Sequence, residues 1–273
     1  MVKALVLAVV LAGLACLGVY LFVNAPPELG AREADAQRIP IATVFEIVAH
    51  ENAVARELYT KEIMQAGTAR GLRFSADWQD PASASGPLPA LFLRETGALL
   101  ERSPVELRLF LGSDLPISAA NRFTGAQATA FERVRATGTP VTLFADDTGL
   151  HTALFPDLAV AQACVECHNA SADSPKHDWR VGDIMGATTW SYPRDSVTPE
   201  ELLALVAALR GAVRDSYAEY VERARAFPDA PEIGERWPRD GHALPTPESF
   251  AREHARLAST DTLTGLLAIT GVP

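Results

Sequence analysis

The chain holds 273 residues, of which 48% are hydrophobic and 21% charged, so it is long enough to bury a sizeable core. Its 34 acidic residues outnumber the 24 basic ones and give a net charge of −10 at neutral pH. That balance argues against nucleic acid as a partner and against docking on anionic lipid surfaces, because both are themselves negatively charged.

The N-terminus is predicted to be a signal anchor over residues 1–24. Ala4 to Val23 carries no charge, follows Lys3, and has about the 20 residues that a helix needs to cross a bilayer. A cleaved signal peptide normally has a shorter apolar region of roughly 7–15 residues. Lys3 on the short inner flank predicts that the bulk of the chain lies in the periplasm, anchored to the cytoplasmic membrane.

Two cleavable alternatives remain open. Residues 23–25 have small side chains at the spacing that suits a signal peptidase, and residues 13–16 resemble a lipobox. The lipobox match lacks the preferred leucine, and the apolar run continues past Cys16. Residues 25–39 hold proline, alanine and charged side chains without periodicity, which predicts a linker from the membrane.

The next part of the chain mixes helical and strand patterns. Apolar residues at three- and four-residue steps predict helices over 41–65, 88–102 and 119–136. Residues 67–89 hold several glycines and prolines and are expected to form an irregular loop. Alternation of apolar and polar side chains predicts a strand over 105–111.

Further strands complete this domain. Residues 140–145 and 150–155 predict a hairpin around the turn 146–149, and residues 183–193 predict one more strand. Leading helices, a central helix and a set of antiparallel strands together predict an α+β domain over 40–196.

Residues 197–273 are predicted to be a C-terminal helical extension and tail. Thr198 and Pro199, with acidic residues in the first turn, are typical of a capped helix start. The apolar stripe of residues 202–224 either packs against the preceding domain or forms a homodimer. Packing is favoured because the stripe is not a strict heptad. One short helix is expected over 247–257.

Residues 164–168 read Cys-Val-Glu-Cys-His, a C-x-x-C-H run that is the attachment site for a c-type haem. Cys164 and Cys167, one turn apart, would add to the haem vinyl groups as thioethers, and His168 would be the proximal iron ligand. The predicted export signal agrees with this, because covalent haem attachment takes place outside the cytoplasmic membrane.

The alternative is a zinc half-site or a redox C-x-x-C. Structural zinc requires four thiol or imidazole ligands, usually from two clustered pairs. The only other cysteine is Cys16, in the apolar N-terminal run, and no second C-x-x-C is present. A thioredoxin-like C-x-x-C would follow a strand in a βαβ unit, which the surrounding sequence does not predict.

The motif region resembles the family of PAS-like haem c sensor domains, once catalogued as a domain of unknown function. The resemblance rests on five segments in order: 155–157, 163–169, 174–176, 178–180 and 182–186. Members occur outside the membrane in bacteria, alone or on chemoreceptors, histidine kinases and cyclases. Over residues 40–196 the resemblance implies a PAS-like antiparallel sheet with flanking helices and one covalent haem c held by Cys164, Cys167 and His168.

The sixth ligand of the iron is less defined. Some relatives offer a distal cysteine from the N-terminal helix, and this helix has none. His50 lies in the corresponding stretch and is the first candidate; Met64, His151 and Met185 rank behind it, and an iron without a distal protein ligand is a further alternative. A lone histidine is more often a surface or core residue than a ligand.

The loop after the motif is the candidate propionate site. Lys176 and Arg180 supply the positive charge that a propionate needs, and Trp179 offers a ring to pack on the haem. The alternative is an ordinary solvated loop.

These observations predict a membrane-anchored periplasmic c-type haem protein. The resemblance implies that it senses redox state or a diatomic gas, and a separate partner is expected because no output domain follows. A monohaem electron carrier is the alternative. An enzyme is not expected, because no acid–base pair accompanies the motif. Residues 257–266 resemble the opening of a diguanylate cyclase domain, which we interpret as a chance match.

Overall fold

The computed structural model describes residues 38–160, 162–235 and 243–270, together with Leu14, Tyr20 and Trp237. The predicted anchor (1–24) and linker (25–39), with Cys16, therefore lie almost wholly outside the described residues. Within the described part of the chain, no helix is long and apolar enough to cross a membrane. From Ile39 onward the chain forms one compact unit.

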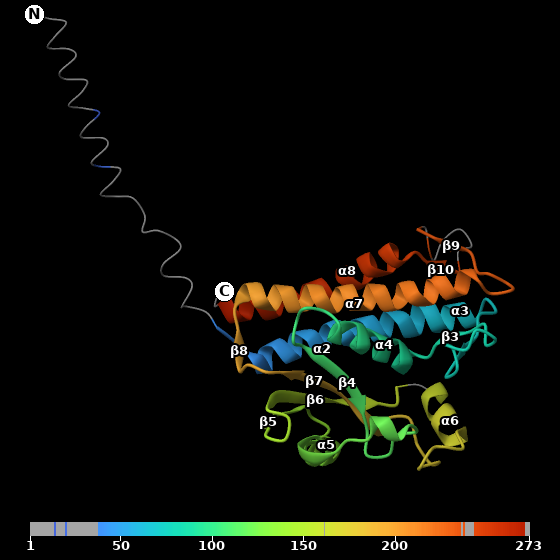
Figure 1. Cartoon of the computed structure of the whole chain (residues 1–273), viewed down its shortest axis with the longest axis horizontal. Helices are drawn as coiled ribbons and strands as arrows, with labels where there is room; N and C mark the ends of the chain where they lie inside the picture. The colour runs from blue at the N-terminus through green and yellow to red at the C-terminus, as the bar shows by residue number, and fades with distance from the viewer. Residues whose placement is uncertain are drawn as a thin grey trace, which may run out of the picture. The chain divides into compact units, whose positions relative to one another are not determined.

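A four-stranded antiparallel sheet lies at the centre of this unit (Figure 1). Its strands are β4 (Arg108–Gly112), β5 (Val141–Ala145), β6 (Leu150–Leu158) and β7 (Ile184–Tyr192). Their order is β4-β7-β6-β5, which confirms the predicted hairpin and places the last strand in the middle. Trp190 of β7 lies opposite Leu109 of β4 and Ala153 of β6.

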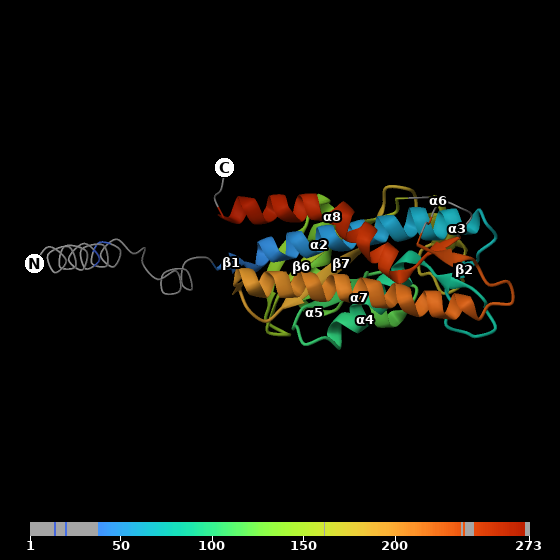
Figure 2. The same cartoon turned by 90° about the horizontal axis from the view of Figure 1, so that it is seen from above.

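Long helices cover one face of the sheet (Figure 1). They are α2 (Ile41–Leu58), which continues as a π-helix (Tyr59–Gln65) and α3 (Ala66–Thr68), α4 (Pro89–Glu101), α7 (Pro199–Arg225) and α8 (Pro247–Thr270). Figure 2 shows α2, α7 and α8 side by side across this face. The expected helices at 41–65 and 88–102 are confirmed, and the fold is a mixed α and β one.

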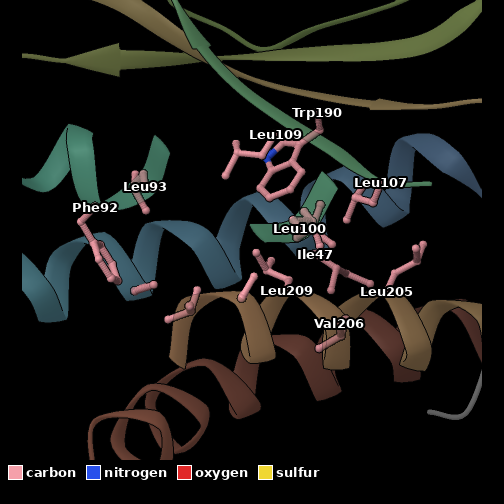
Figure 3. Close-up of a cluster of buried hydrophobic side chains, with 14 of the residues drawn as sticks. Ile47, Phe92, Leu93, Leu100, Leu107, Leu109, Trp190, Leu205, Val206 and Leu209 are labelled. Carbon is pink, nitrogen blue, oxygen red and sulfur yellow. The ribbon is translucent and has the colours of Figure 1, made fainter. Parts of the chain in front are cut away.

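The main core fills the space between these helices and the sheet (Figure 3). Trp190 is fully buried and meets leucines of α4, β4 and α7 there, among them Leu100, Leu109 and Leu209. Burying one of these leucine side chains contributes about 1.5–3 kcal/mol relative to leaving it exposed. Gly97 lets α4 lie directly on β4, because a Cβ at that position would come within 2.9 Å of the Leu109 carbonyl oxygen.

Helix α5 (Gly125–Thr137) covers the other face, where Phe131 and Val134 pack against the sheet. The predicted start at residue 119 is wrong. Ala119–Asn121 form a 3-10 turn whose backbone bonds to the end of β4. The helix proper starts where the Asp147 carboxylate accepts from the Ala126 amide, and such acceptance satisfies a free N–H of the first turn.

Short strand pairs close the remaining loops. They are β1 (Ile39–Pro40) with β8 (Ser196–Val197), β2 (Phe74–Ser75) with β3 (Gly86–Pro87), and β9 (Ile233–Gly234) with β10 (Leu244–Pro245). The β1–β8 pair brings the two ends of the predicted 40–196 domain side by side. The β2–β3 pair lies in the segment 67–89, which the sequence predicted to be an irregular loop.

The C-terminal extension packs on the same core. Thr198 and Glu201 form the predicted capping box of α7, and the apolar stripe of α7 is buried against α4 and α2 within the chain. The expected short helix over 247–257 is wrong, because α8 continues to Thr270. Its buried side chains recur every four residues and keep one face on α2 and α7: Phe250, His254, Ala258 and Thr262.

Candidate haem-attachment site

The C-x-x-C-H motif lies on α6 (Gln162–Ala170), inside the long connection between β6 and β7. Cys164, Cys167 and His168 occupy positions i, i+3 and i+4, so the helix presents all three side chains on one face. Both thiols are free; Cys164 is half-buried and Cys167 is exposed. Two thiols and an imidazole are therefore available together along one helical turn.

The connection is tied to the sheet at its base and to α6 near its middle. The amide of Ala159 donates to the Asp183 carbonyl, and the Gly182 amide donates to the Ala159 carbonyl, each at 2.9 Å. The side chain of Asn169 forms two hydrogen bonds with the backbone of Trp179: it donates to the carbonyl at 3.0 Å and accepts from the amide at 2.9 Å. The loop that follows the motif is thereby folded back against the motif helix.

A small apolar cluster supports the motif. Ala159, Val165 and Trp179 are buried in it, and Leu115, Cys164 and Met185 pack against them. Trp179 is only 7% exposed, and its Nε1 has no hydrogen-bond partner in the described part of the chain. The structure therefore brings the predicted Trp179 and Cys164 together, along with Met185.

Lys176 and Arg180, the two cationic residues predicted to bind a haem propionate, lie in different surroundings. The Lys176 ammonium lies 4.5 Å from the centroid of the Trp179 ring and pairs with Asp178 at 2.5 Å. The side chain of Arg180 is exposed, and its backbone amide donates to Asp183. Lys176 is thus beside the motif loop with an acidic partner, while Arg180 faces solvent.

His168 is a half-buried imidazole whose pKa is lowered from its ordinary value. Burial is the main cause; the charge of Arg94 lowers the pKa further, and the charge of Asp157 opposes both. Its Nδ1 atom is buried and meets no hydrogen-bond partner among the described residues. A lowered pKa keeps the imidazole neutral near pH 7, which is the form that binds a metal.

Asp157 and its partner Arg56 were not singled out from the sequence as site residues. Asp157 lies at a bulge in the β6–β7 ladder, and bulges re-aim side chains next to functional sites. The guanidinium of Arg56, on α2, pairs with this carboxylate. This ion pair joins α2 to the strand that leads into the motif.

Arg94 of α4 is a second residue that sequence reasoning missed. It is half-buried, its charge reaches His168, and no carboxylate of the described residues forms a salt bridge with it. A single arginine within an amphipathic helix carries no local signal of such an environment, so only the tertiary structure reveals it.

The four distal-ligand candidates lie in four different places. The charge of His50 acts on His254 of α8 and helps to lower its pKa. Six residues of helix turn through about 600°, so His50 lies about 120° around α2 from Arg56. Met64 belongs to the π-helix and packs on the main core, and π-helical turns are frequent at functional sites.

The other two candidates are on the sheet. The His151 ring lies 5.0 Å from that of Phe144, roughly 23 Å along β6 from Leu158, where the strand ends. Met185 alone among the candidates packs in the apolar cluster that holds Cys164. The assignment of His50 as distal ligand stays a prediction.

The donor set fits a covalently attached haem. Two free thiols and a neutral imidazole share one helix face, and an apolar cluster with an indole ring supports them. For the part of the chain that the structure describes, no group of three or more His, Cys, Asp or Glu side chains could hold a metal ion by itself.

The sequence model of the Tll0287-like family matches residues 34–193, which is more than half of the 273-residue chain. The match covers the whole sheet and the motif helix, while α7 and α8 lie outside it. No curated protein and no solved structure matches the chain.

Proposed function

Because the chain belongs to the Tll0287-like family, we propose that it is a c-type haem protein with a PAS-like sensor domain. The observation that carries the proposal is that Cys164, Cys167 and His168 lie on one face of α6. Burial lowers the pKa of His168, which leaves its imidazole in the neutral form that binds a metal. The antiparallel sheet with flanking helices, and the family match itself, support the PAS-like assignment.

Each motif residue has a distinct role in this proposal. The Cys164 and Cys167 thiols add across the two vinyl groups: each sulfur bonds to one vinyl carbon, and its proton goes to the other. His168 would bind the iron of the attached haem. Once bound, the haem supplies one-electron redox chemistry or a binding position for a diatomic gas.

The proposed signal is redox state or a diatomic gas, passed to a separate protein partner. The proposed location is the periplasmic side of the cytoplasmic membrane, with the apolar run Ala4 to Val23 as anchor. Electron transfer is the second candidate function. The exposure of Cys167 favours it, because a haem edge near the surface shortens the path to a redox partner.

Intact mass spectrometry tests the cofactor. After expression with a cytochrome c maturation system, the chain should exceed its polypeptide mass by one haem that acid–acetone does not extract. Cys164→Ala and Cys167→Ala should each weaken attachment, and Cys16→Ser is the matched control that should leave it intact. An unmodified mass of the wild-type chain would refute the proposal.

Absorption spectra separate the two functions. Oxidised, reduced and CO-treated protein should be compared. A CO-induced shift of the reduced spectrum supports gas sensing through an open or labile sixth position. A six-coordinate spectrum that CO does not change supports electron transfer or redox sensing.

A further inference from the structure

Arg94 is a half-buried cation without an acidic partner. The Asn121 amide, oriented with its oxygen toward the guanidinium, accepts from Nη1 at 3.2 Å and from Nη2 at 2.8 Å. The third nitrogen, Nε, is buried, and none of the described residues accepts from it. The guanidinium is therefore held in place by a neutral oxygen, while the N–H of its Nε is unused.

This environment is costly for a positive charge. Burial lowers the pKa of Arg94, and no neighbouring acid raises it. Arg210, in the helical layer, is different. Its Nε and Nη2 both donate hydrogen bonds to the Glu51 carboxylate. A half-buried charge without a counter-charge is unfavourable, because it has lost part of its hydration and gained no ionic partner in exchange. A bound anion would remove that cost.

The position of Arg94 indicates which anion. The Ser113 amide donates to the Asn121 carbonyl at 3.0 Å, and the Ser113 hydroxyl donates to the Met185 carbonyl at 2.7 Å. Met185 in turn packs on the cluster that holds Cys164. Arg94 is thus linked to the motif by a short chain of contacts, and its charge acts on His168.

We propose that Arg94 binds a propionate carboxylate of the attached haem, with Asn121 holding the guanidinium in register. The planar fork of arginine matches a carboxylate with two parallel hydrogen bonds, and the free Nε supplies one of them. Lys176 is half-buried but already pairs with Asp178, and Arg180 is exposed, so neither is a half-buried cation without an acidic partner. This inference rests on the proposed haem attachment.

The test uses the haem-loaded chain and two readouts, the reduction potential and the propionate bending bands in resonance Raman spectra. Arg94→Gln should lower the potential, because the guanidinium favours the ferrous haem, which carries one positive charge less. A tenfold change in the reduced-to-oxidised ratio, equal to about 59 mV for one electron, is expected, together with shifted propionate bands. Arg102→Gln, which changes the exposed arginine at the C-cap of the same helix, is the matched control that should change neither.

Further variants exclude trivial outcomes. Asn121→Asp places a protein carboxylate against Arg94 and should also shift the propionate bands by competition. Arg94→Lys keeps the charge but loses the fork, so the bands should move while most of the potential is kept; it serves as the test if Arg94→Gln does not fold. Arg180→Gln tests the cation predicted from the sequence.

The outcomes keep the two proposals apart. If the wild-type mass shows no haem, the proposed function itself fails. If haem is attached and Arg94→Gln behaves like Arg102→Gln in both readouts, the Arg94 proposal is overturned while the haem assignment stands. Shifts in Arg180→Gln with none in the Arg94 variants would likewise overturn it and return the propionate to the loop.

Discussion

Two buried polar regions of the molecule are organised in opposite ways. In the helical layer, the fully buried Glu51 carboxylate of α2 accepts two hydrogen bonds from Arg210 of α7, at 2.9 and 2.5 Å, and one from the Thr262 hydroxyl of α8, at 2.6 Å. His254 donates to the Glu51 backbone carbonyl at 2.9 Å. Three helices are thereby joined through one satisfied carboxylate, with only Nδ1 of His254 left unpaired among these groups.

The second region, which we call the motif edge, consists of Arg94, His168 and Trp179 around α6, and each of these side chains has a polar atom without a hydrogen-bond partner among the described residues. His168 Nδ1, Trp179 Nε1 and Arg94 Nε are all buried, and the described structure gives none of them a hydrogen-bond partner. The core also holds unpaired atoms, such as Nε1 of Trp190. Nε of Arg223 is unpaired as well, but that guanidinium donates to the Trp78 carbonyl and lies over the Trp78 ring. The motif edge is where an unpaired imidazole atom and an uncompensated cation lie near each other.

The difference distinguishes buried polar groups that stabilise the fold from buried polar groups that are available to bind another molecule. Buried polar groups are nearly always hydrogen-bonded in native proteins, and each exception calls for an explanation. The Glu51 carboxylate satisfies this rule within the chain and fixes α8 to α2 and α7. The motif edge satisfies it only if another molecule supplies the missing partners.

The largest predicted effect is on the satisfied network. Arg210→Met should lower the free energy of unfolding by about 3–5 kcal/mol, because it leaves a fully buried carboxylate without a counter-charge. The neighbouring exposed pair of Arg214 and Asp215 provides the control, since Arg214→Met should cost at most about 1 kcal/mol. Urea unfolding of the haem-loaded chain measures both.

The haem content of Arg210→Met should equal that of the wild type, because the variant leaves the motif edge intact. A loss of haem without a loss of stability would contradict the separation of the two regions.

Local sequence signals predicted much of this architecture. The motif, the hairpin and the capped start of α7 each depend on residues a few positions apart, and the structure confirms the hairpin and the cap. The ion pairs could not be predicted this way, because Arg56 and Asp157 are 101 residues apart, and Glu51 and Arg210 are 159 apart.

The length of α8 also could not be predicted from local sequence signals. The sequence predicted a short helix over 247–257, whereas α8 continues to Thr270. Thr262 is buried, because its hydroxyl completes the Glu51 network, and Gly265 allows α8 to approach Ile47 of α2 closely. Tertiary contacts therefore decide where this helix ends.

A second prediction concerns pH. Burial is the main cause of the lowered pKa of His254, and the charges of Arg210 and His50 lower it further, against an opposing contribution from Glu51. The unfolded chain therefore takes up this proton first as the pH falls below the ordinary value of 6.5. The contribution of His254 to stability should be complete above pH 6.5 and decrease below it, by at most about 1.4 kcal/mol per pH unit, until the folded pKa is reached.

His254→Gln is the matched variant for this pH effect, since its amide can still donate to the Glu51 carbonyl. Unfolding measured between pH 5 and 8 (a range set by the ordinary histidine pKa of about 6.5) should be less pH-dependent for the variant than for the wild type. Equal slopes for the two proteins would mean that His254 is not the group that titrates.

A smaller effect is expected at the motif edge. Trp179→Phe removes an indole nitrogen that has no partner, so the loss of packing should be partly offset and the stability should change by about 1 kcal/mol or less. Trp190→Phe makes the same chemical change in the tightly packed centre of the core and should cost more, because a cavity would remain there. Thermal unfolding of both variants compares the regions directly; a larger cost at Trp179 would reverse the comparison.

The last prediction has the smallest effect on stability and is read from the haem spectrum. Following the sequence, we predict that His50→Ala changes the low-spin ferric spectrum more than Met64→Leu, His151→Ala or Met185→Leu, because imidazole binds ferric iron well. The structure adds a rival, since Met185 shares the cluster of Cys164 whereas His50 lies toward His254 on α8. If Met185→Leu gives the largest change and lowers the potential, a methionine is the distal ligand, because methionine ligation raises the potential. If none of the four variants changes the spectrum, the iron has no distal protein ligand among them, and the motif edge would then be open at the iron as well, which favours gas sensing over electron transfer.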